Sequence, residues 1–193
     1  MHAVHLDDDE VDRFAATGVS IAHCPKSNLK LANGIAPVAK YRNAGINVAL
    51  GTDGAASNNM LDMFSEMQTA ALLGKTAADD ATAINAQDAL DMATMGGARA
   101  LRLERSIGSI EQGKLADLVC VDFDRFNTRP VYDVVSQLVY ATASTQVSDV
   151  WVGGRHQLEN GRLTQIDRQD LVARADEWRD RIALSDKHVE EDQ

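Results

Sequence analysis

Short apolar runs alternate with patterns of helical spacing over about the first 105 residues. The apolar runs predict strands at residues 1–6, 19–23 and 46–50. The helical patterns predict a helix from the acidic residues 7–10 to Gly18, one over 38–43, and longer ones over 61–73 and 86–101. Strands that alternate with helices in this way indicate βα units and a parallel sheet. We expect the polar residues that follow each strand to lie at one edge of that sheet.

The pattern changes near Gly108, where short strands become more frequent. Residues 107–122 predict two strands joined by a turn, and strands at 147–152 and 155–158 flank the tight turn at Gly153-Gly154. A helix is expected over 131–140, and the tail over 167–191 places Leu171, Ala175, Trp178 and Ile182 on one helical face. We therefore divide the chain into a βα part (1–106), a small β-sandwich portion (107–165) and a helical tail (166–193).

Composition narrows the class of protein. A formal net charge of -10 and a pI near 4.8 argue against a nucleic-acid partner, which requires clustered Lys and Arg. No stretch approaches the roughly 20 apolar residues of a membrane span, and the start of the chain does not resemble a signal peptide. We expect a cytoplasmic protein. Two features are expected to be core: both cysteines, as small buried hydrophobes, and the methionines Met60, Met63 and Met67.

Asp53 is the most informative polar residue. It follows an apolar run directly and is flanked by Gly51 and Gly54, so its carboxylate would lie at a strand end with little steric cover. Such an Asp is either a helix cap or turn residue, or a metal ligand or general base. The small polar segment 55–59 that follows favours the second interpretation, because loops of this kind let backbone and amide groups approach a ligand.

Two histidines near the other predicted strand ends are further candidates. On a strand, His2 and His5 would face opposite sides, so at most one of them points into a shared site. A lone strand histidine is more often structural. His23 closes the second predicted strand, and it is equally suited to ordering its own loop or to contacting a substrate.

Five segments together resemble the amidohydrolase superfamily, in particular its branch of methylthioadenosine/S-adenosylhomocysteine deaminases and triazine hydrolases. They are Met1-His2-Ala3-Val4-His5-Leu6, His23-Cys24-Pro25-Lys26-Ser27-Asn28-Leu29-Lys30-Leu31, Leu50-Gly51-Thr52-Asp53-Gly54-Ala55-Ala56-Ser57-Asn58-Asn59, and the stretches 92–101 and 108–118. The resemblance implies an α/β fold, the C-terminal part of a metal-dependent (β/α)8 TIM barrel with part of a small β-sandwich and a C-terminal helix.

The resemblance also implies site roles. Asp53 would be a metal ligand and would accept the proton of the attacking water, and His2 would hydrogen-bond the hydroxide or the developing oxyanion. His23, Asn28, Ser57 and Asn58 would lie next to the substrate. The cofactor would be one divalent metal, Zn²⁺ first and Fe²⁺ second. The substrate would be a small molecule, and the intact enzyme would be a homo-oligomer.

The chain departs from the family pattern in one respect. The H-x-H pair and the H-x-x-E motif that supply the family's other metal ligands are absent. A catalytic zinc needs about three protein ligands and an open position, and a whole barrel takes roughly 250 residues. We therefore expect a C-terminal fragment with an incomplete ligand set, inactive in isolation, whose partner is the missing N-terminal half of the barrel.

The resemblance implies a hydrolytic deaminase that releases ammonia from an aminated heterocycle such as 5-methylthioadenosine or S-adenosylhomocysteine. One alternative is a triazine-type chlorohydrolase or aminohydrolase, or a guanine deaminase, of the same superfamily. The other is a half-barrel without catalytic function that serves as an interaction module.

Overall fold

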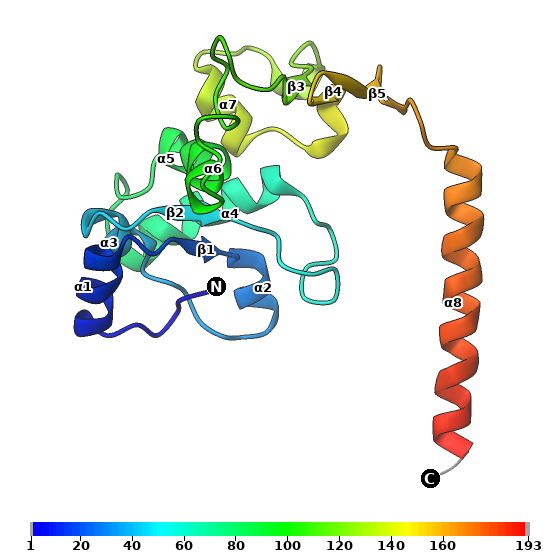
Figure 1. Ribbon diagram of the computed structural model, residues 1–193, viewed down its shortest axis with the longest axis horizontal. Coiled ribbons are helices and arrows are strands. Elements are labelled where there is room, and N and C mark those ends of the chain that lie inside the picture. The colour runs from blue at the N-terminus through cyan, green and yellow to red at the C-terminus, as the bar shows by residue number, and fades with distance from the viewer. Residues whose placement is uncertain (1, 192–193) are drawn as a thin grey trace.

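The computed structural model describes residues 2–191, and the side chains of residues 2–184. The helices are α1 (Asp8–Thr17), α2 (Pro25–Lys30), α3 (Val38–Asn43), α4 (Met63–Ala78), α5 (Ala86–Ala93), α6 (Met95–Ala100), α7 (Val134–Tyr140) and α8 (Arg168–Glu191). The strands are β1 (Ile21–His23), β2 (Val48–Leu50), β3 (Leu118–Val121), β4 (Val147–Val152), β5 (Arg155–Glu159) and β6 (Arg162–Leu163). Two short 3₁₀ turns, η1 (Phe126–Thr128) and η2 (Ser144–Gln146), flank α7. Figure 1 shows their arrangement.

Strands β1 and β2 form a parallel pair at the centre of the N-terminal part. Ile21 pairs with Val48 and His23 pairs with Leu50, and the N–H of Gly51 extends the ladder by donating to the His23 carbonyl at 3.0 Å. Because parallel strands end at the same edge, the segments that follow His23 and Leu50 emerge side by side. This register brings the two polar segments of the sequence together.

The main core lies between this strand pair and the helices around it. It includes Ile21 and Val48 from the strands, Tyr41 from α3, Met67 from α4 and Met92 from α5, each at most 4% exposed. Helix α7 joins the same core through Val139, although it belongs in sequence to the predicted small domain. The predicted domain boundaries stay predictions, and α7, which follows the boundary at residue 106 in sequence, packs against the core of the part before that boundary.

Local sequence signals set the ends of α1. The Asp7 side chain accepts from the backbone N–H of Glu10, whose side chain accepts in turn from the Asp7 N–H, forming a capping box. Gly18 ends the helix in the left-handed conformation at φ 67°. The predicted helix between the acidic run and Gly18 is confirmed, and so is the predicted helix over residues 38–43.

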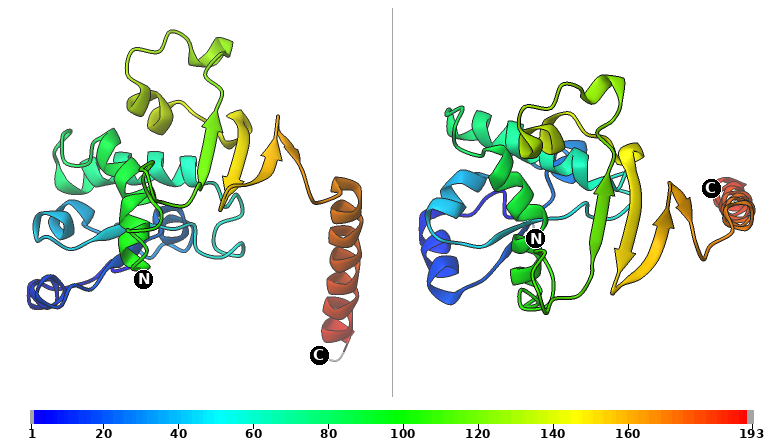
Figure 2. Two further views of the ribbon diagram at one scale, coloured as in Figure 1. Left: turned by 45° about the horizontal axis from the view of Figure 1, so that its top comes forward. Right: turned by 90° about the horizontal axis from the view of Figure 1, so that it is seen from above.

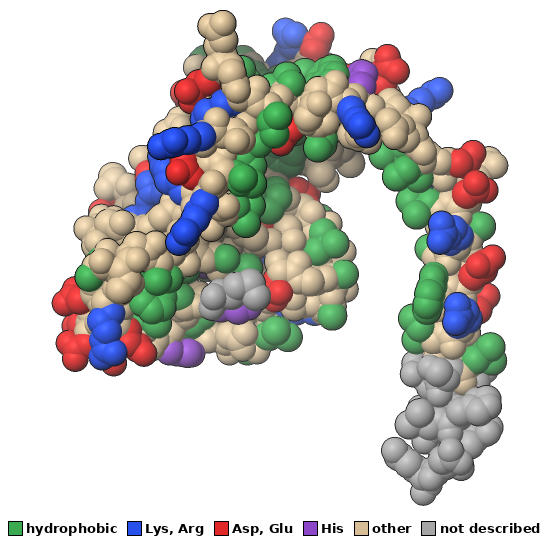
Figure 3. Space-filling model, in the orientation of Figure 1, with side chains coloured by type: hydrophobic (Ala, Val, Ile, Leu, Met, Phe, Trp, Pro, Cys, Tyr) green, Lys and Arg blue, Asp and Glu red, His purple; other side chains and the backbone are tan. Residues whose placement is uncertain are grey.

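The second sheet has the antiparallel order β3-β4-β5-β6. Its strands lie side by side between the helical body and α8 (Figure 2). Helix α8 stands apart from the body, and apolar side chains gather on its side that faces the body (Figure 3). Among its residues Leu171, Val172 and Trp178 are each more than half exposed. No helix in the described part of the chain is both long enough and apolar enough to cross a membrane.

The predicted strand at residues 1–6 is wrong. Residues 2–7 contain no strand, because His2 and Ala3 take positive φ angles of 65° and 47° that are incompatible with extended pairing. A single backbone bond from His2 to the Ala22 carbonyl, 3.0 Å long, and a bond from the Tyr41 hydroxyl to the Ala3 carbonyl hold the segment beside β1. His2 and His5 therefore do not alternate across a strand, and strand geometry does not decide which of them points into the site.

Three other expectations differ from the structure. The helix expected over 86–101 is broken into α5 and α6 at Thr94, whose φ of -120° and ψ of -89° are not helical. The first of the two strands expected over 107–122 is absent, and Ile110 within it is 88% exposed. Only β3 forms there. The polar segment after β1, which the sequence suggested was a loop, is the short helix α2.

The expected burial of sulfur side chains is confirmed only in part. Cys24 and Met67 are buried, whereas Cys120 and Met60 are exposed. Cys120 lies on β3, where the adjacent Val119 is also exposed. Met60 lies in the loop before α4, where the Lys26 ammonium contacts its sulfur at 3.7 Å. Spacing alone did not distinguish these exposed positions from the core ones.

The contact between α6 and β2 gives a stability test with a neighbouring control. A Cβ at position 96 would meet the Val48 carbonyl oxygen at 2.4 Å, whereas one at position 97 would meet nothing within 4 Å. We expect Gly96→Ala to lower the free energy of unfolding by about 1–3 kcal/mol through overpacking against backbone. Gly97→Ala should raise it by up to about 1 kcal/mol through helix propensity. Urea unfolding of both variants measures the difference, and equal effects would contradict the close approach.

Candidate active site

Asp53 lies just beyond the end of β2. Its φ of 62° is in the left-handed region, which Asp adopts more readily than most residues because its short side chain bonds nearby groups. The turn continues with Ser57 and Asn58, whose backbone N–H groups both donate to the Gly54 carbonyl. The carboxylate is therefore carried on a tight, internally bonded turn.

Two hydroxyl groups donate to one carboxylate oxygen of Asp53. Ser27 Oγ, from α2, is 2.7 Å from Oδ2, and Ser57 Oγ, from the turn, is 2.8 Å from the same atom. The hydrogen bond from Ser27, followed by those from Ser57 and from the Gly54 backbone, lowers the pKa of Asp53. The side chain is 25% exposed. Asp53 is thus an ionised carboxylate at neutral pH that remains accessible to a ligand.

His2 faces this carboxylate. Its Nδ1 lies 2.7 Å from Oδ1 of Asn28, so Nδ1 carries the proton and donates to that oxygen. In the neutral ring Nε2 then carries a lone pair, and it lies 3.7 Å from Oδ2 of Asp53. A lone pair and a carboxylate that face each other at this distance form a place for a proton or a metal cation.

His23 ends β1 and is only 2% exposed. Burial, followed by the proximity of His2, lowers the pKa of His23 to about 4, so the imidazole is neutral at physiological pH. Its Nδ1 has no hydrogen-bond partner among the described residues, nor does Nδ2 of Asn28, which is 1% exposed. Two buried polar atoms without partners in this region are available to a small polar ligand or to water.

The structure places the sequence candidates in two groups. One group consists of two hydrogen-bonded pairs, His2 with Asn28 and Ser57 with Asp53, which meet where His2 Nε2 lies 3.7 Å from Asp53 Oδ2. Asn58 is 4% exposed and donates instead to the Thr52 carbonyl at 2.9 Å and to Oε1 of Glu66 at 2.6 Å, behind the turn. His23 is buried at the strand end, where its Nδ1 bonds to neither group, and His5 is exposed.

Sequence reasoning did not single out two residues of this region, Ser27 and Glu66. Ser27 lay within a segment interpreted as a loop. Pro25, a residue favoured in the first turn of a helix, was the available signal for the helix that turns Ser27 toward Asp53. Glu66 lies in the predicted long helix, and no local pattern marks it as buried.

The donor set in the described part of the chain does not complete a zinc site. Zinc in catalytic sites takes about three protein ligands plus an open position, and no group of three or more His, Cys, Asp or Glu residues is placed to hold a metal within the residues described. Asp53 has the charge and the accessibility of a single ligand. Any remaining ligands would have to come from outside these residues.

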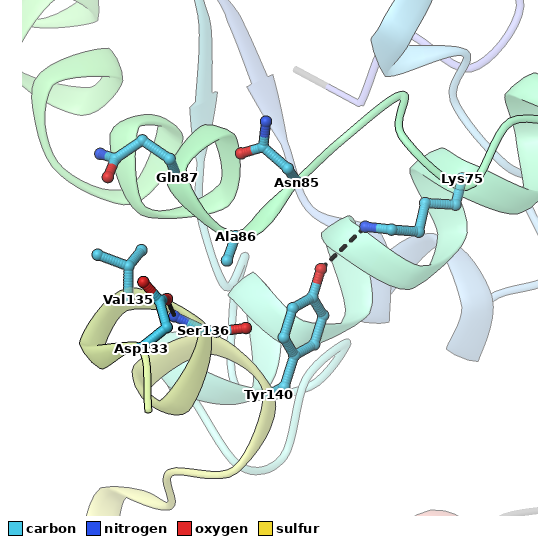
Figure 4. A pocket seen from close by; sticks show the side chains of 8 residues that line it. All are labelled: Lys75, Asn85, Ala86, Gln87, Asp133, Val135, Ser136 and Tyr140. Atoms are coloured by element: carbon cyan, nitrogen blue, oxygen red, sulfur yellow. Dashed lines mark hydrogen bonds between the residues drawn. The ribbon is translucent and has the colours of Figure 1, made fainter. Parts of the chain in front are cut away.

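A separate pocket of about 400 Å³ lies between α4, α5 and α7 (Figure 4). Its polar groups already have partners in the fold. The Lys75 ammonium donates to the Tyr140 hydroxyl at 2.8 Å and to the Ile84 carbonyl, while Asn85 and Asp133 cap α5 and α7. None of the residues bonded to Asp53 lines this pocket, and we assign the candidate site to the strand ends.

Known proteins that are similar to this chain show which family it belongs to. The sequence pattern of the amidohydrolase family matches residues 1–156. The chain belongs to this family. The predicted α/β class, with βα units of a barrel fold and a small β portion, agrees with this membership and is confirmed.

Similar proteins include enzymes of two activities. A 5-methylthioadenosine/S-adenosylhomocysteine deaminase from Teredinibacter turnerae is 47% identical over 184 residues, which cover 94% of this chain and 42% of the relative. An adenosine deaminase structure from Xanthomonas campestris with bound zinc has a TM-score of 0.93 at 52% identity, covering 95% of this chain and 42% of that one. A zinc complex of atrazine chlorohydrolase from Arthrobacter aurescens has a TM-score of 0.84 at 34% identity, covering 90% and 38%. The chain thus spans about two fifths of the length of these relatives.

The burial of His23 predicts a pH dependence of stability. The folded state favours the neutral imidazole, so between pH 6.5 and about 4 the unfolded chain binds more protons than the folded one. The His23 contribution is therefore complete above pH 6.5 and is lost as the pH falls toward 4, by about 3 kcal/mol at most.

Urea unfolding of the wild type and of His23→Gln across this range measures that contribution. The free-energy difference between the two proteins should narrow as the pH falls, because Gln does not titrate. A difference that stays constant from pH 7 to pH 4 would show that His23 titrates normally in the folded protein.

Proposed function

We propose that this chain supplies the strand-end carboxylate and the neighbouring imidazole of a metal-dependent hydrolytic deaminase. The observation that carries the proposal is the pairing of Asp53 with His2, 3.7 Å apart at the end of a parallel strand pair. The substrate proposed is an aminated heterocycle of the 5-methylthioadenosine or S-adenosylhomocysteine type. The names of the most similar relatives support this choice.

Asp53 is proposed as one ligand of a divalent metal, zinc in the first instance. When bound, such a metal would lower the pKa of a coordinated water and so make hydroxide available near neutral pH. The chain's own residues carry the rest of the proposal. The Asp53 carboxylate, kept ionised by the Ser27 and Ser57 hydroxyls, accepts a proton. His2 donates to the group that develops negative charge once its Nε2 is protonated, because its Nδ1 proton is bonded to Asn28.

We propose that four residues lie next to the substrate and differ in their roles: His23, Asn28, Ser57 and Asn58. The unpartnered buried atoms of His23 and Asn28 suit a direct polar contact. Ser57 supports Asp53, whereas Asn58 supports the turn from behind. A triazine hydrolase is a second candidate function, favoured by the likeness to atrazine chlorohydrolase at 34% identity. A substrate panel scored for ammonia against chloride release separates the two.

The remaining metal ligands are proposed to come from a polypeptide equivalent to the N-terminal part of the relatives. The span of the chain, 42% of the Teredinibacter turnerae relative, and the apolar side of α8 that faces the body support this proposal. Homo-oligomeric assembly and a cytoplasmic location, which the resemblance and the composition imply, stay predictions.

The isolated 193-residue chain gives the first test. Because the described residues offer no three-ligand cluster, we expect the purified chain to bind zinc no more tightly than its Asp53→Asn variant does, as measured by isothermal titration calorimetry. It should also release no ammonia from 5-methylthioadenosine. Tight binding of one zinc per chain, or ammonia release without a partner, would refute the requirement for outside ligands.

The second test adds a polypeptide equivalent to the N-terminal part of the relatives. The chain is refolded together with the N-terminal segment of the Teredinibacter turnerae deaminase that it does not cover, in the presence of Zn²⁺, and ammonia release is assayed. We expect activity that falls by about 10²–10⁴-fold or more in Asp53→Asn, because a ligand and proton acceptor is lost. Asp88→Asn, the same chemical change on α5 away from the site, is the control and should retain activity. Undiminished activity in Asp53→Asn would contradict the assigned role.

A further inference from the structure

Glu66 is a buried acid on α4 that makes no contact with Asp53. Its side chain is 0% exposed, and burial raises its pKa despite the hydrogen bonds that it accepts. A carboxyl group inside a protein core costs free energy unless hydrogen bonds compensate for the loss of water. The partners of Glu66 therefore show which groups it holds in place.

Both carboxyl oxygens of Glu66 are used. Oε1 accepts from Nδ2 of Asn58 at 2.6 Å, and Oε2 accepts from the backbone N–H of Lys26 at 3.4 Å. The same Asn58 amide also donates to the Thr52 carbonyl at 2.9 Å. Glu66 thus ties α4 to the start of α2 on one side and to the turn that carries Asp53 on the other.

The two segments that Glu66 joins carry the two hydroxyls on Asp53. Ser27 directly follows Lys26, and Ser57 directly precedes Asn58. Their Oγ atoms lie 2.7 and 2.8 Å from Oδ2 of Asp53. One buried side chain therefore bonds the residue next to each donor, through the backbone N–H of Lys26 and through the side-chain amide of Asn58.

We propose that Glu66 is a positioning residue that holds the Ser27 and Ser57 hydroxyls on the Asp53 carboxylate from the layer behind the site. The proposal deepens the proposed function, since it concerns the carboxylate to which that function assigns metal binding and proton transfer. Its test requires neither metal nor substrate. A failed test of deamination therefore leaves this proposal standing, and the reverse also holds.

The experiment observes the carboxylate carbon of Asp53 directly. In Glu66→Gln the amide nitrogen cannot accept, so either the Asn58 amide or the Lys26 N–H loses its partner. At pH 7.5 the ¹³Cγ resonance of Asp53 in the 193-residue chain should move in the same direction as in Ser27→Ala and Ser57→Ala. Asp88→Asn, which alters the Arg42–Asp88 ion pair outside the site, should leave the resonance unchanged.

A double-mutant cycle separates positioning from a general loss of structure. If Glu66 acts through the two serines, Glu66→Gln should cause no further shift of the Asp53 resonance in the Ser27→Ala/Ser57→Ala background. An unchanged resonance in folded Glu66→Gln would overturn the proposal. The proposal would also be overturned if Glu66→Gln shifted the resonance as much in the Ser27→Ala/Ser57→Ala variant as it does in the wild type.

A second variant applies if Glu66→Gln does not fold. Glu66→Asp keeps the charge but shortens the side chain by one methylene, so the carboxylate cannot reach both partners. It should move the Asp53 resonance in the direction of the serine variants. A folded Glu66→Asp protein with the wild-type resonance would overturn the proposal in the same way.

Discussion

The parallel pairing of β1 with β2 is the constraint on which the candidate site depends. Only three residue pairs form it, yet because His23 pairs with Leu50, the segments that follow β1 and β2 leave the sheet at the same edge. The hydroxyl of Ser27 can reach Asp53 only because of that alignment. Strands this short are not stable alone, so the burial of Ile21 and Val48 against the surrounding helices maintains the register.

Where the sequence predicted the structure well, the signals were local. The ends of α1 follow from a capping box and a glycine, and β4 with β5 follows from an apolar run and the turn at Gly153-Gly154. Where it failed, a distant contact decided the conformation. Helix α6 packs so closely on β2 that a Cβ at Gly96 would meet the Val48 carbonyl, and no pattern within residues 86–101 predicts that contact.

The candidate site divides in the same way. Asp53 and His2 were proposed because their motifs resemble those of a family, and the structure brings them within 3.7 Å of each other. Ser27 and Glu66 required the fold, since Ser27 depends on an unforeseen helix and Glu66 on the burial of one face of α4. The groups that lower the pKa of Asp53 are its immediate neighbours Ser27, Ser57 and Gly54, and all of them belong to this chain. No cluster of three metal-binding side chains forms among the residues that the structure describes.

The left-handed backbone at Asp53 restricts what can replace it. Of the two acidic residues, Asp adopts this conformation more readily than Glu, because its short side chain can hydrogen-bond within the turn and so offset the steric cost of the Cβ. Asparagine and glycine also fit the backbone, but neither carries a negative charge. Position 53 is therefore specified twice, once by electrostatics and once by the Ramachandran map. Asp is the one amino acid that meets both demands, so exchange between acidic residues, harmless on most surfaces, is not a neutral step here.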